Sequence, residues 1–387
     1  MPILNADLQT MSVFADIYAT TGANSIVYGS LLSGDVSTVG ANASITGNLV
    51  SVGAATIGAG KASVGGYLTS GGLATIGAGA SVGSDILSSG AATIGANAYV
   101  GGNVTTNGVA TTGDTSVVAG HVVAGGAASI GANAIVDKYV GAVGVISVAA
   151  SAIVPLKMTL SLSPAIPNLT AVINERVVAD AAQIETTQRM LNNLGGGLKL
   201  APTMVTNTTL MSGVYSAASL STTAGTTLTL DGQNKPNQLW VFNIANILVT
   251  GASTKVDMIN AGPGSAVIWN TGGYASLGAS SEFIGTVLAQ DYISVGANAL
   301  VSGSDAFCGQ LLSRSYVSAG ASAVIGSAGC VSKGVIDISK DGKPSYVPTT
   351  SAVPEPSTYA MLLAGTCLLS LRKRRAKNIW LTEKKEV

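Results

Sequence analysis

The chain has little charge and a single histidine, and both shortages exclude classes of function. Only 10% of its 387 residues are charged, and nineteen basic side chains balance nineteen acidic ones. A net charge of zero argues against a basic nucleic-acid-binding protein. His121 is the one histidine, which argues against a hydrolase triad and against a histidine-rich metal site. We therefore expect no nucleic-acid partner, no metal and no cofactor.

Carboxylates and glycine-rich loops show no active site either. Asp35, Asp85, Asp114 and Asp137 are scattered without the spacing of a calcium loop. Gly60-Lys61 lacks the flanking glycine and hydroxyl residue that a phosphate loop needs. A polysaccharide-cleaving enzyme would need clustered carboxylates, whereas this chain supplies mostly Thr, Ser, Gly and Ala. We expect a protein that is not an enzyme.

Glycine and small apolar residues are abundant instead. The chain has 49 glycines, 47% of its residues are hydrophobic, and its mean hydropathy is +0.47. A solvated, disordered chain would be more polar and more highly charged. The glycines also lack the strict three-residue period of collagen. The composition therefore indicates an ordered fold with many glycine-containing turns.

The C-terminus has three parts in a fixed order. Pro354-Glu355-Pro356 comes first, an apolar segment over 359–371 follows, and Arg372-Lys373-Arg374-Arg375 ends it. This order resembles the PEP-CTERM sorting signal of Gram-negative bacteria, here over 353–375, with a basic tail over 376–387. The resemblance implies processing by an exosortase and transient passage through the inner membrane by way of the apolar segment. It also implies export to the cell surface or to an exopolysaccharide matrix.

Charge is divided unevenly between this tail and the rest of the chain. Residues 372–387 hold seven basic and two acidic side chains, which leaves twelve basic and seventeen acidic ones in residues 1–371. Such an asymmetry indicates a terminal segment with a role of its own. Residues 1–30 contain no Lys or Arg, so a secretory signal peptide is not recognisable there. We expect the true start of the protein to lie upstream.

The first half contains a repeat with a period of 18 or 19 residues. Thr56-Ile57-Gly58-Ala59 recurs, identical or closely related, at positions that begin with Thr38, Thr75, Thr93, Thr111 and Ser129. Within this period, residues of the kind expected to point into the interior recur every six positions. Three six-residue units per period describe one turn of a triangular β-solenoid, which we expect over 36–150. The pattern resembles hexapeptide-repeat and bactofilin-like solenoids.

Strand alternation assigns an orientation to each side chain of the repeat. We expect Ile57, Ile76, Ile94 and Ile130 inside, because large apolar residues fill the interior. The residue before each of them then points outward. Stacking of the turns would align these hydroxyls in one column, made of Thr38, Thr56, Thr75, Thr93, Thr111 and Ser129. Gly and Asn recur at the corners, where unusual backbone angles are needed.

One amphipathic helix follows the repeat. Prolines at 155, 164 and 167 mark a crossover. Apolar residues from Ile173 to Leu194 then recur on one helical face, which predicts a helix over 174–194. Asn174 is the expected N-cap, and Gly195-Gly196-Gly197 ends the helix.

The second half carries β-strand signals and five ordered motifs. Three later turns align as Tyr-x-Ser-x-Gly-Ala, with tyrosines at 274, 292 and 316. The motifs are Met211-Ser212-Gly213-Val214-Tyr215, Leu228-Thr229-Leu230-Asp231-Gly232, Trp240-Val241-Phe242-Asn243-Ile244, Ile268-Trp269-Asn270 and Phe283-Ile284-Gly285-Thr286-Val287-Leu288-Ala289. They resemble the microbial ice-binding-protein-like family over about 165–327. The resemblance implies a discontinuous, triangular β-solenoid with a helix along one side.

These patterns together predict an all-β fold, namely a triangular β-solenoid (β-helix) with one long α-helix packed alongside. They also divide the chain into six segments: an N-terminal segment over 1–35, a solenoid of 18-residue repeats over 36–150, an ice-binding-like solenoid over 151–335, a linker over 336–352, the sorting signal over 353–375 and the basic tail over 376–387.

Two functions remain open from the sequence. The family resemblance implies an exported, antifreeze-like protein that binds ice through a flat face bearing Thr and Ser, and it offers a second column at Ser276, Ser294 and Ser318. The alternative is a structural or adhesive component of the exopolysaccharide or biofilm matrix. Tyr274, Tyr292 and Tyr316 favour this alternative, because sugars bind aromatic platforms. Cys308 and Cys330 are about one turn apart, so a disulfide is a further expectation for an exported chain.

Overall fold

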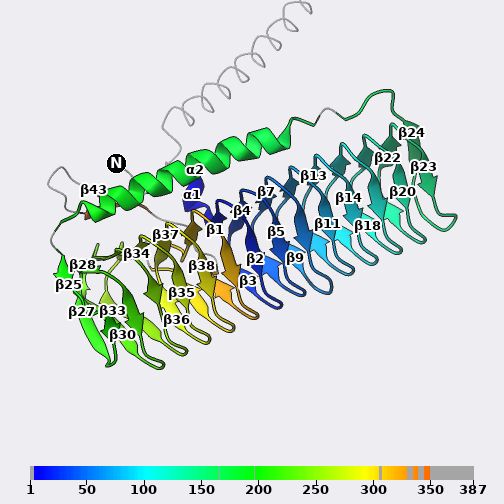
Figure 1. Ribbon diagram of the computed structural model, residues 1–387. Coiled ribbons are helices and arrows are strands. Elements are labelled where there is room, and N and C mark those ends of the chain that lie inside the picture. Colours follow the sequence, from blue (N-terminus) through cyan, green and yellow to red (C-terminus); the bar gives the residue numbers. More distant parts are fainter. Residues whose placement is uncertain are drawn as a thin grey trace, which may run out of the picture. The chain divides into compact units, whose positions relative to one another are not determined.

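Three parallel β-sheets run side by side along the molecule (Figure 1). The computed structural model describes residues 4–164, 166–195, 197–304, 307–328, 334–338 and 344–348. In these residues the sheets hold 15, 14 and 13 strands. We name them sheet 1, which contains β1 (Met11–Ala15), sheet 2, which contains β2 (Ala19–Thr21), and sheet 3, which contains β3 (Ile26–Val27). The expected triangular β-solenoid is confirmed.

The strands of each sheet follow one another in a regular order. Along sheet 1 they are β24 (Leu156–Thr159), β22 (Tyr139–Ala142), β19 (Val122–Ala124), β16 (Val104–Thr106), β13 (Ile86–Ser88), β10 (Leu68–Ser70), β7 (Leu49–Ser51), β4 (Ser30–Ser33), β1, β40 (Leu311–Ser313), β37 (Thr286–Ala289), β34 (Ala266–Thr271), β31 (Leu239–Ile244), β28 (Gly213–Ala217) and β25 (Leu198–Lys199). Along sheet 2 they are β23 (Ile146–Val148), β20 (Ala128–Ile130), β17 (Ala110–Thr112), β14 (Ala92–Ile94), β11 (Ala74–Ile76), β8 (Ala55–Ile57), β5 (Ser37–Val39), β2, β41 (Val317–Ala319), β38 (Ile293–Val295), β35 (Ala275–Leu277), β32 (Leu248–Val249), β29 (Leu220–Thr222) and β26 (Thr203–Met204). Along sheet 3 they are β21 (Ile135–Val136), β18 (Val117–Val118), β15 (Tyr99–Val100), β12 (Ser81–Val82), β9 (Ser63–Val64), β6 (Ser44–Ile45), β3, β42 (Val324–Ile325), β39 (Leu300–Ser302), β36 (Glu282–Ile284), β33 (Lys255–Ala261), β30 (Thr227–Lys235) and β27 (Thr208–Met211).

The two halves of the solenoid join end to end at their first and last turns. Strand β1 pairs with β4 on one side and with β40 on the other, so Phe14 lies opposite both Leu32 and Leu312. Strands β2 and β3 make the equivalent pairings with β41 and β42. The chain therefore builds the N-terminal half outward from the junction, crosses to the far end of the C-terminal half, and returns to the junction. β-Structure begins at Met11, inside the segment that the sequence analysis set apart as residues 1–35.

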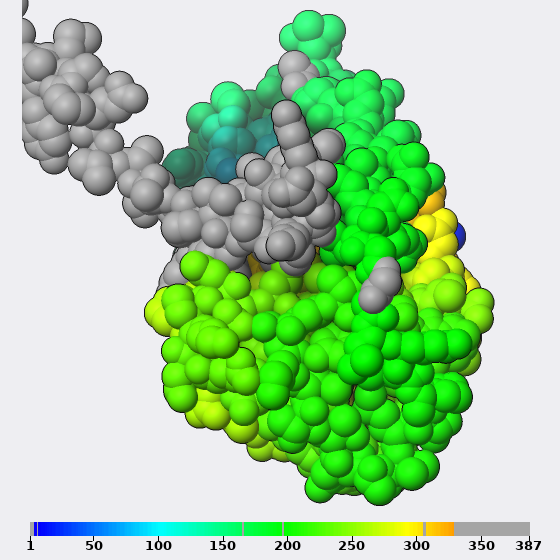
Figure 2. All heavy atoms as spheres, turned by 90° about the vertical axis from the view of Figure 1, so that its left-hand side faces the viewer, coloured from blue at the N-terminus to red at the C-terminus, as the bar shows by residue number. Residues whose placement is uncertain are grey.

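The end of the C-terminal half faces the viewer in Figure 2, where the residues coloured green belong to its outermost turns and to α2. Strands β43 (Gly334–Ile338) and β44 (Pro344–Pro348) form a separate two-stranded sheet. Residues 1–347 make up one compact unit and residues 348–387 a second. Among the described residues, no helix is long and apolar enough to span a membrane.

The interior of the N-terminal half is built from branched aliphatic residues and alanine. Ile57, Ile76, Ile94 and Ile130 are each at most 2% exposed, as strand alternation predicts. In the C-terminal half, aromatic rings take over this role. Phe242 and Trp269 stack inside with ring centroids 4.0 Å apart. Both halves thus enclose one continuous apolar core.

A buried column of hydroxyl residues closes the corner between sheets 1 and 2. Ser51, Ser70 and Ser88 are fully buried, although they hold positions where the repeat would favour apolar residues. The Ser70 hydroxyl donates to the carbonyl oxygens of Gly53 (2.8 Å) and Leu73 (2.9 Å). Both carbonyls also accept a main-chain N–H, from Gly72 and Ala55, so the serine adds a second hydrogen bond at this corner while its own buried hydroxyl stays paired.

The corner between sheets 2 and 3 needs a left-handed residue on most turns. Asn42, Asn97 and Asn133 adopt φ values of 55–57°, and Gly60 and Gly79 take the equivalent place with φ of 84° and 72°. Asparagine and glycine tolerate this backbone conformation best. The expectation that Gly and Asn mark the corners is confirmed.

The long helix α2 spans Leu169–Asn192 and begins earlier than predicted. Its N-cap is Asn168, whose side chain accepts a hydrogen bond from the Ala171 amide, whereas Asn174 is exposed inside the helix. The prediction of a start at Asn174 is therefore wrong, because an N-cap must present its side chain to free amides before the first turn. After Asn192 the chain leaves the helix, and Gly195 takes a left-handed φ of 67°.

Helix α2 covers the outer face of sheet 1 across the junction (Figure 1). Its buried face includes Ile173, Val177 and Ile184, which pack in one cluster with Phe14 and Ile268 of sheet 1. At about 1.5 Å per residue the helix extends about 36 Å, which corresponds to seven or eight strand spacings of about 4.8 Å. It therefore packs against both halves, and no helix of the described residues covers sheet 2 or sheet 3.

Gln310 fastens the N-terminus at the junction. Its buried Nε2 donates to the carbonyl oxygens of Leu8 (2.7 Å), in the short helix α1 (Ala6–Gln9), and Met11 (2.8 Å). Its Oε1 accepts a hydrogen bond from Thr286 (3.2 Å). One side chain from the last turns thus satisfies two carbonyls about 300 residues away in the sequence.

Replacing Ile94 by Asp would place an unpaired charge in the core. We expect the free energy of unfolding to fall by several kcal/mol, or the protein not to fold. Thr93→Asp is the matched control, since Thr93 is exposed on the same strand, and it should change stability by less than about 1 kcal/mol. Thermal and urea unfolding would measure both. Equal unfolding curves for the two variants would refute the inward orientation.

Replacing Gln310 by Leu would leave the Leu8 and Met11 carbonyls without their partner. We expect a loss of about 1–3 kcal/mol in the free energy of unfolding. Gln290→Leu changes the same residue type at an exposed position after β37 and should cost less than about 0.5 kcal/mol. If Gln310→Leu unfolds at the same urea concentration as Gln290→Leu, this buried contact does not stabilise the junction.

Candidate functional site

One column of outward-facing residues runs the whole length of sheet 2. Strand pairing places its members opposite one another, and thirteen of the fourteen are Ser or Thr. In order they are Thr203, Ser221, Val249, Ser276, Ser294, Ser318, Thr20, Thr38, Thr56, Thr75, Thr93, Thr111, Ser129 and Ser147. We call this set the hydroxyl column.

The structure joins two columns that the sequence analysis treated as separate. Thr20 pairs with Thr38 on one side and with Ser318 on the other, so all nine predicted candidates belong to the hydroxyl column. Thr20 was missed, yet its signal is visible: Tyr18-Ala19-Thr20-Thr21-Gly22-Ala23 matches the Tyr-x-Ser/Thr-x-Gly-Ala pattern of the later turns. Ser147, Ser221 and Thr203 extend the column at its two ends.

The column is long, regular and accessible. Its members are exposed or half-exposed, and parallel strands repeat every ~4.8 Å, so it extends about 60 Å. Within the described part of the chain, only Thr203 and Ser221 are joined by a side-chain hydrogen bond along it, of 3.0 Å. The other hydroxyl groups are therefore available to water or to a ligand.

Glycines line one flank of the column, so no side chain projects there. Gly40, Gly58, Gly77, Gly95 and Gly113 lie two residues after successive hydroxyl residues. A Cβ added at Gly77 would lie 2.5 Å from the carbonyl carbon of Gly58, which is closer than any real contact. The turns can stack this closely only because glycine occupies the position. The surface beside the hydroxyls is consequently flat.

The other flank carries apolar and aromatic side chains. Two residues before the hydroxyls lie Val36, Leu73, Val109 and Val145 in the N-terminal half, all at least 36% exposed. In the turns around the junction, tyrosines take this place. The face of sheet 2 thus consists of three parallel columns: apolar or aromatic, hydroxyl, and glycine.

Charge is absent from the described strands of sheet 2. None of its fourteen strands contains Asp, Glu, Lys or Arg. Sheet 3, by contrast, carries Lys255, whose Nζ lies 3.2 Å from Asp257 and 3.7 Å from Glu282. Sheet 1 is partly covered by α2. Sheet 2 therefore combines exposed hydroxyls with an absence of charge along its whole described length.

Four tyrosines form a stacked ladder beside the hydroxyl column and across the junction. The ring centroids of Tyr274, Tyr292, Tyr316 and Tyr18 follow one another at 4.6, 4.8 and 4.7 Å, with planes within 5°. Desolvation within this stack is the main cause that raises the pKa of Tyr292 and of Tyr316. Each inner ring has both faces covered by its neighbours. The ladder therefore presents ring edges, whereas a sugar platform needs open ring faces.

The remaining predicted residues do not form a second site in the described structure. Cys308 is disulfide-bonded, and its expected partner Cys330 lies outside the described residues. The sorting residues Pro354, Glu355, Pro356, Arg372, Lys373, Arg374 and Arg375, with the apolar segment 359–371, lie outside them too. His121 stacks on Tyr139 with centroids 4.8 Å apart, and burial lowers its pKa. No group of three or more metal-binding side chains occurs in the part of the chain that the structure describes.

Comparison with protein families returns two matches. A family model described as ice-binding-like matches residues 104–325, which begins within the N-terminal repeats rather than at the helix. A second model, the PEP-CTERM protein-sorting motif, matches residues 352–375. The resemblance of the N-terminal repeats to hexapeptide-repeat and bactofilin-like solenoids stays a prediction.

Two characterised relatives share about a third of their residues with this chain over the matched part. Ice-binding protein 1 of Shewanella frigidimarina is 33% identical over 109 residues, which make up 27% of this chain and 12% of that protein. The ice-binding protein of a Nostoc species is 34% identical over 134 residues, 34% of this chain and 49% of that protein. The chain thus matches about an eighth and about half of the length of these relatives.

Solved structures of low sequence identity also match. An ice-binding protein from the Antarctic ascomycete Antarctomyces psychrotrophicus is 15% identical with a TM-score of 0.41, over 84% of this chain and 97% of that one. A domain of ice-binding protein 1 from Shewanella frigidimarina is 17% identical with a TM-score of 0.40, over 84% and 99% of the two chains.

Proposed function

Because this chain belongs to the ice-binding-like family, we propose that it is an exported, non-enzymatic protein that binds ice through the outer face of sheet 2. The observation that carries the proposal is the hydroxyl column. It continues through both halves of the solenoid without a change of face. The ice surface is the partner that best suits such a regular array.

The chemistry of the column suits ordered water. A Thr residue offers one hydroxyl donor with two acceptor lone pairs beside a methyl group, so each turn contributes both a hydrogen-bonding and an apolar contact. Repetition at ~4.8 Å allows many such contacts to be made at once. The absence of charge from the strands of sheet 2 means that no strongly hydrated ion has to be stripped of its water there.

The tyrosine ladder weighs against the alternative of a polysaccharide platform on this face. Stacking covers both ring faces of Tyr292 and Tyr316 and one face each of Tyr274 and Tyr18, the faces that a sugar would contact. The rigid edges of the ladder instead extend the flat surface beside Ser276, Ser294 and Ser318. Both the Thr-bearing and the Ser-bearing parts of the column then contribute to ice contact.

The sorting motif supports export. We propose that an exosortase cleaves the chain close to Pro354-Glu355-Pro356 after a transient passage of residues 359–371 through the inner membrane. The released protein would lose the seven basic residues of 372–387 and keep the mildly acidic body. Its destination would be the cell surface or the extracellular matrix of a Gram-negative bacterium.

Bulky side chains on the hydroxyl column should abolish close contact with ice. We expect Thr75→Tyr with Thr93→Tyr, and separately Ser294→Tyr with Ser318→Tyr, to lower thermal hysteresis and inhibition of ice recrystallisation several-fold. Each pair lies on adjacent turns, so the two rings would hold a flat crystal face away from the hydroxyls. Unfolding temperatures would confirm that the fold is intact.

Sheet 3 offers a matched control on the same turns of the solenoid. Ser63→Tyr with Ser81→Tyr places two tyrosines in a column that already holds Tyr99 beside Ser81, and it should leave ice activity unchanged. If both sheet 2 pairs retain full activity, sheet 2 is not the ice-binding face. Absence of activity from the unmodified protein would refute ice binding itself.

Export predicts a shorter mature protein. Intact-mass analysis of the extracellular form from the native host should show a C-terminus close to Pro354-Glu355-Pro356. Recovery of an extracellular chain that still carries residues 372–387 would refute cleavage by an exosortase.

A further inference from the structure

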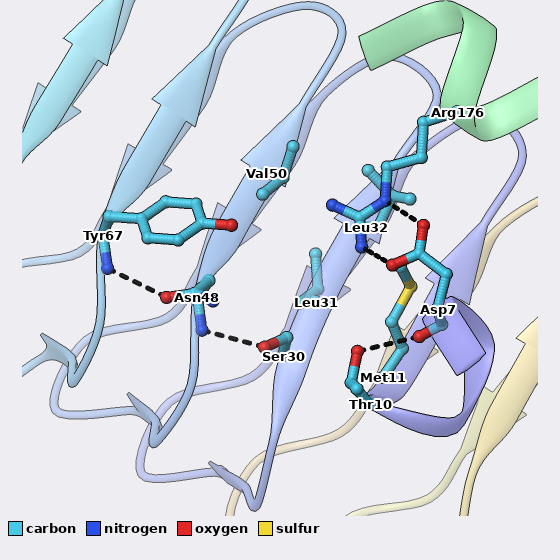
Figure 3. Close-up of a pocket in the computed structure, with 10 residues that line it drawn as sticks. All are labelled: Asp7, Thr10, Met11, Ser30, Leu31, Leu32, Asn48, Val50, Tyr67 and Arg176. Atoms are coloured by element: carbon cyan, nitrogen blue, oxygen red, sulfur yellow. Dashed lines mark hydrogen bonds and ion pairs between the residues drawn. The ribbon is translucent and has the colours of Figure 1, made fainter. Parts of the chain in front are cut away.

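A pocket of about 240 Å³ lies on the helix-bearing side of the molecule, away from the face of sheet 2. It opens between α1, the start of α2, and strands β4 and β7 of sheet 1 (Figure 3). The pocket therefore has room for several water molecules. This volume is slightly below the usual range for a small-molecule site, and it suits one ring of a larger ligand.

One wall of the pocket is formed by the ion pair between Arg176 and Asp7, whose charges cancel. Arg176 of α2 donates from Nε to Asp7 Oδ2 (2.7 Å) and from Nη2 to Asp7 Oδ1 (2.5 Å). This two-point contact fixes the orientation of the guanidinium group. Figure 3 shows the third guanidinium nitrogen pointing away from Asp7, toward the side of the pocket on which Tyr67 lies. The wall therefore offers fixed N–H donors and carboxylate acceptors together.

The opposite wall is an amide and an aromatic ring. Asn48 Oδ1 accepts a hydrogen bond from the backbone N–H of Tyr67 (3.1 Å), and the backbone N–H of Asn48 donates to Ser30 Oγ (3.1 Å). These bonds hold Asn48 in place and leave its side-chain NH₂ group as a donor. Tyr67 is 39% exposed, and its ring extends over the pocket in Figure 3. Beneath, Leu32 and Val50 line the floor, but both are buried and offer a ligand little apolar surface.

We propose that this pocket binds one ring of a neutral saccharide. Adjacent hydroxyl groups of a sugar both donate and accept, which matches the guanidinium and amide donors and the Asp7 carboxylate. The C–H groups of the ring match the exposed side chain of Tyr67. An anion is not favoured, because Asp7 already balances the Arg176 charge. An apolar ligand is not favoured either, because it would strip water from that ion pair without replacing its hydrogen bonds.

This inference goes beyond ice binding and does not depend on it. Sheets 1 and 2 are different faces of the triangular solenoid, so a sugar bound beside α2 leaves the hydroxyl column uncovered. The protein would then hold a glycan on one face while another face remains free.

The test is a titration of the full chain with glucose, galactose, mannose and N-acetylglucosamine, each taken separately. Binding of each sugar is measured by saturation-transfer NMR. We expect saturable binding of at least one of these sugars. Asn48→Ala with Tyr67→Ala should weaken that binding by about tenfold or more, because it removes a directional donor and the ring together. The variant should keep the thermal hysteresis of the unmodified protein.

The chain offers a matched control outside the pocket. Asn103 plays the same part in its corner as Asn48, since its Oδ1 accepts from the His121 amide (3.2 Å), and Tyr99 is similarly exposed at 47%. Asn103→Ala with Tyr99→Ala should leave sugar binding unchanged. No saturable binding of any of the four sugars, or equal weakening in both double variants, would overturn the proposal. Loss of ice activity by sheet 2 variants that still bind sugar would show that the two sites are independent.

Discussion

The main-chain hydrogen bonds between successive turns are the interaction on which every other feature depends. They hold each residue opposite its equivalent on the next turn, from β24 to β25 in sheet 1 and along the two other sheets. Because the register is kept across the junction between β1 and β40, a side chain that is outward on one turn is outward on all. A short local pattern is thereby converted into a surface about 60 Å long. Even the tight corners serve this register, since buried serines and left-handed asparagines let each turn close on itself.

Each of the three faces has a different composition, and the difference has a physical basis. Sheet 1 has apolar outward residues such as Phe14, Leu32 and Ile268, which α2 buries. Sheet 3 carries ion pairs around Lys255, which need solvent. Among the described residues, no helix covers sheet 2 and its strands carry no charge, so its surface is that of hydroxyls, glycines and a rigid aromatic edge.

Local patterns in the sequence predicted the interior and the outward column of the N-terminal half, because strand alternation acts over a few residues. They predicted the residues at the corners for the same reason.

Local patterns could not predict the junction between the two halves. Thr20 and Ser318 become neighbours only through pairing between strands almost 300 residues apart. The hydrogen bonds of the buried serines could not be predicted, because the carbonyls that they contact lie at a corner whose shape follows from stacking. The start of α2 was missed because Asn168 and Asn174 are equally good caps in sequence. The pocket between α1 and α2 depends entirely on tertiary contacts.

The order in which the chain visits its own turns has a consequence for its biogenesis. Strands β1 to β3 are made early, yet one of their edges is paired only when β40 to β42 arrive near the end of the described chain. Until then the N-terminal half exposes an unpaired edge of the kind that promotes association between chains. The centre of the solenoid therefore remains incomplete until β40 to β42 have been made and have paired. Folding speed at that junction, rather than the strength of any single turn, would decide how much of the protein escapes aggregation.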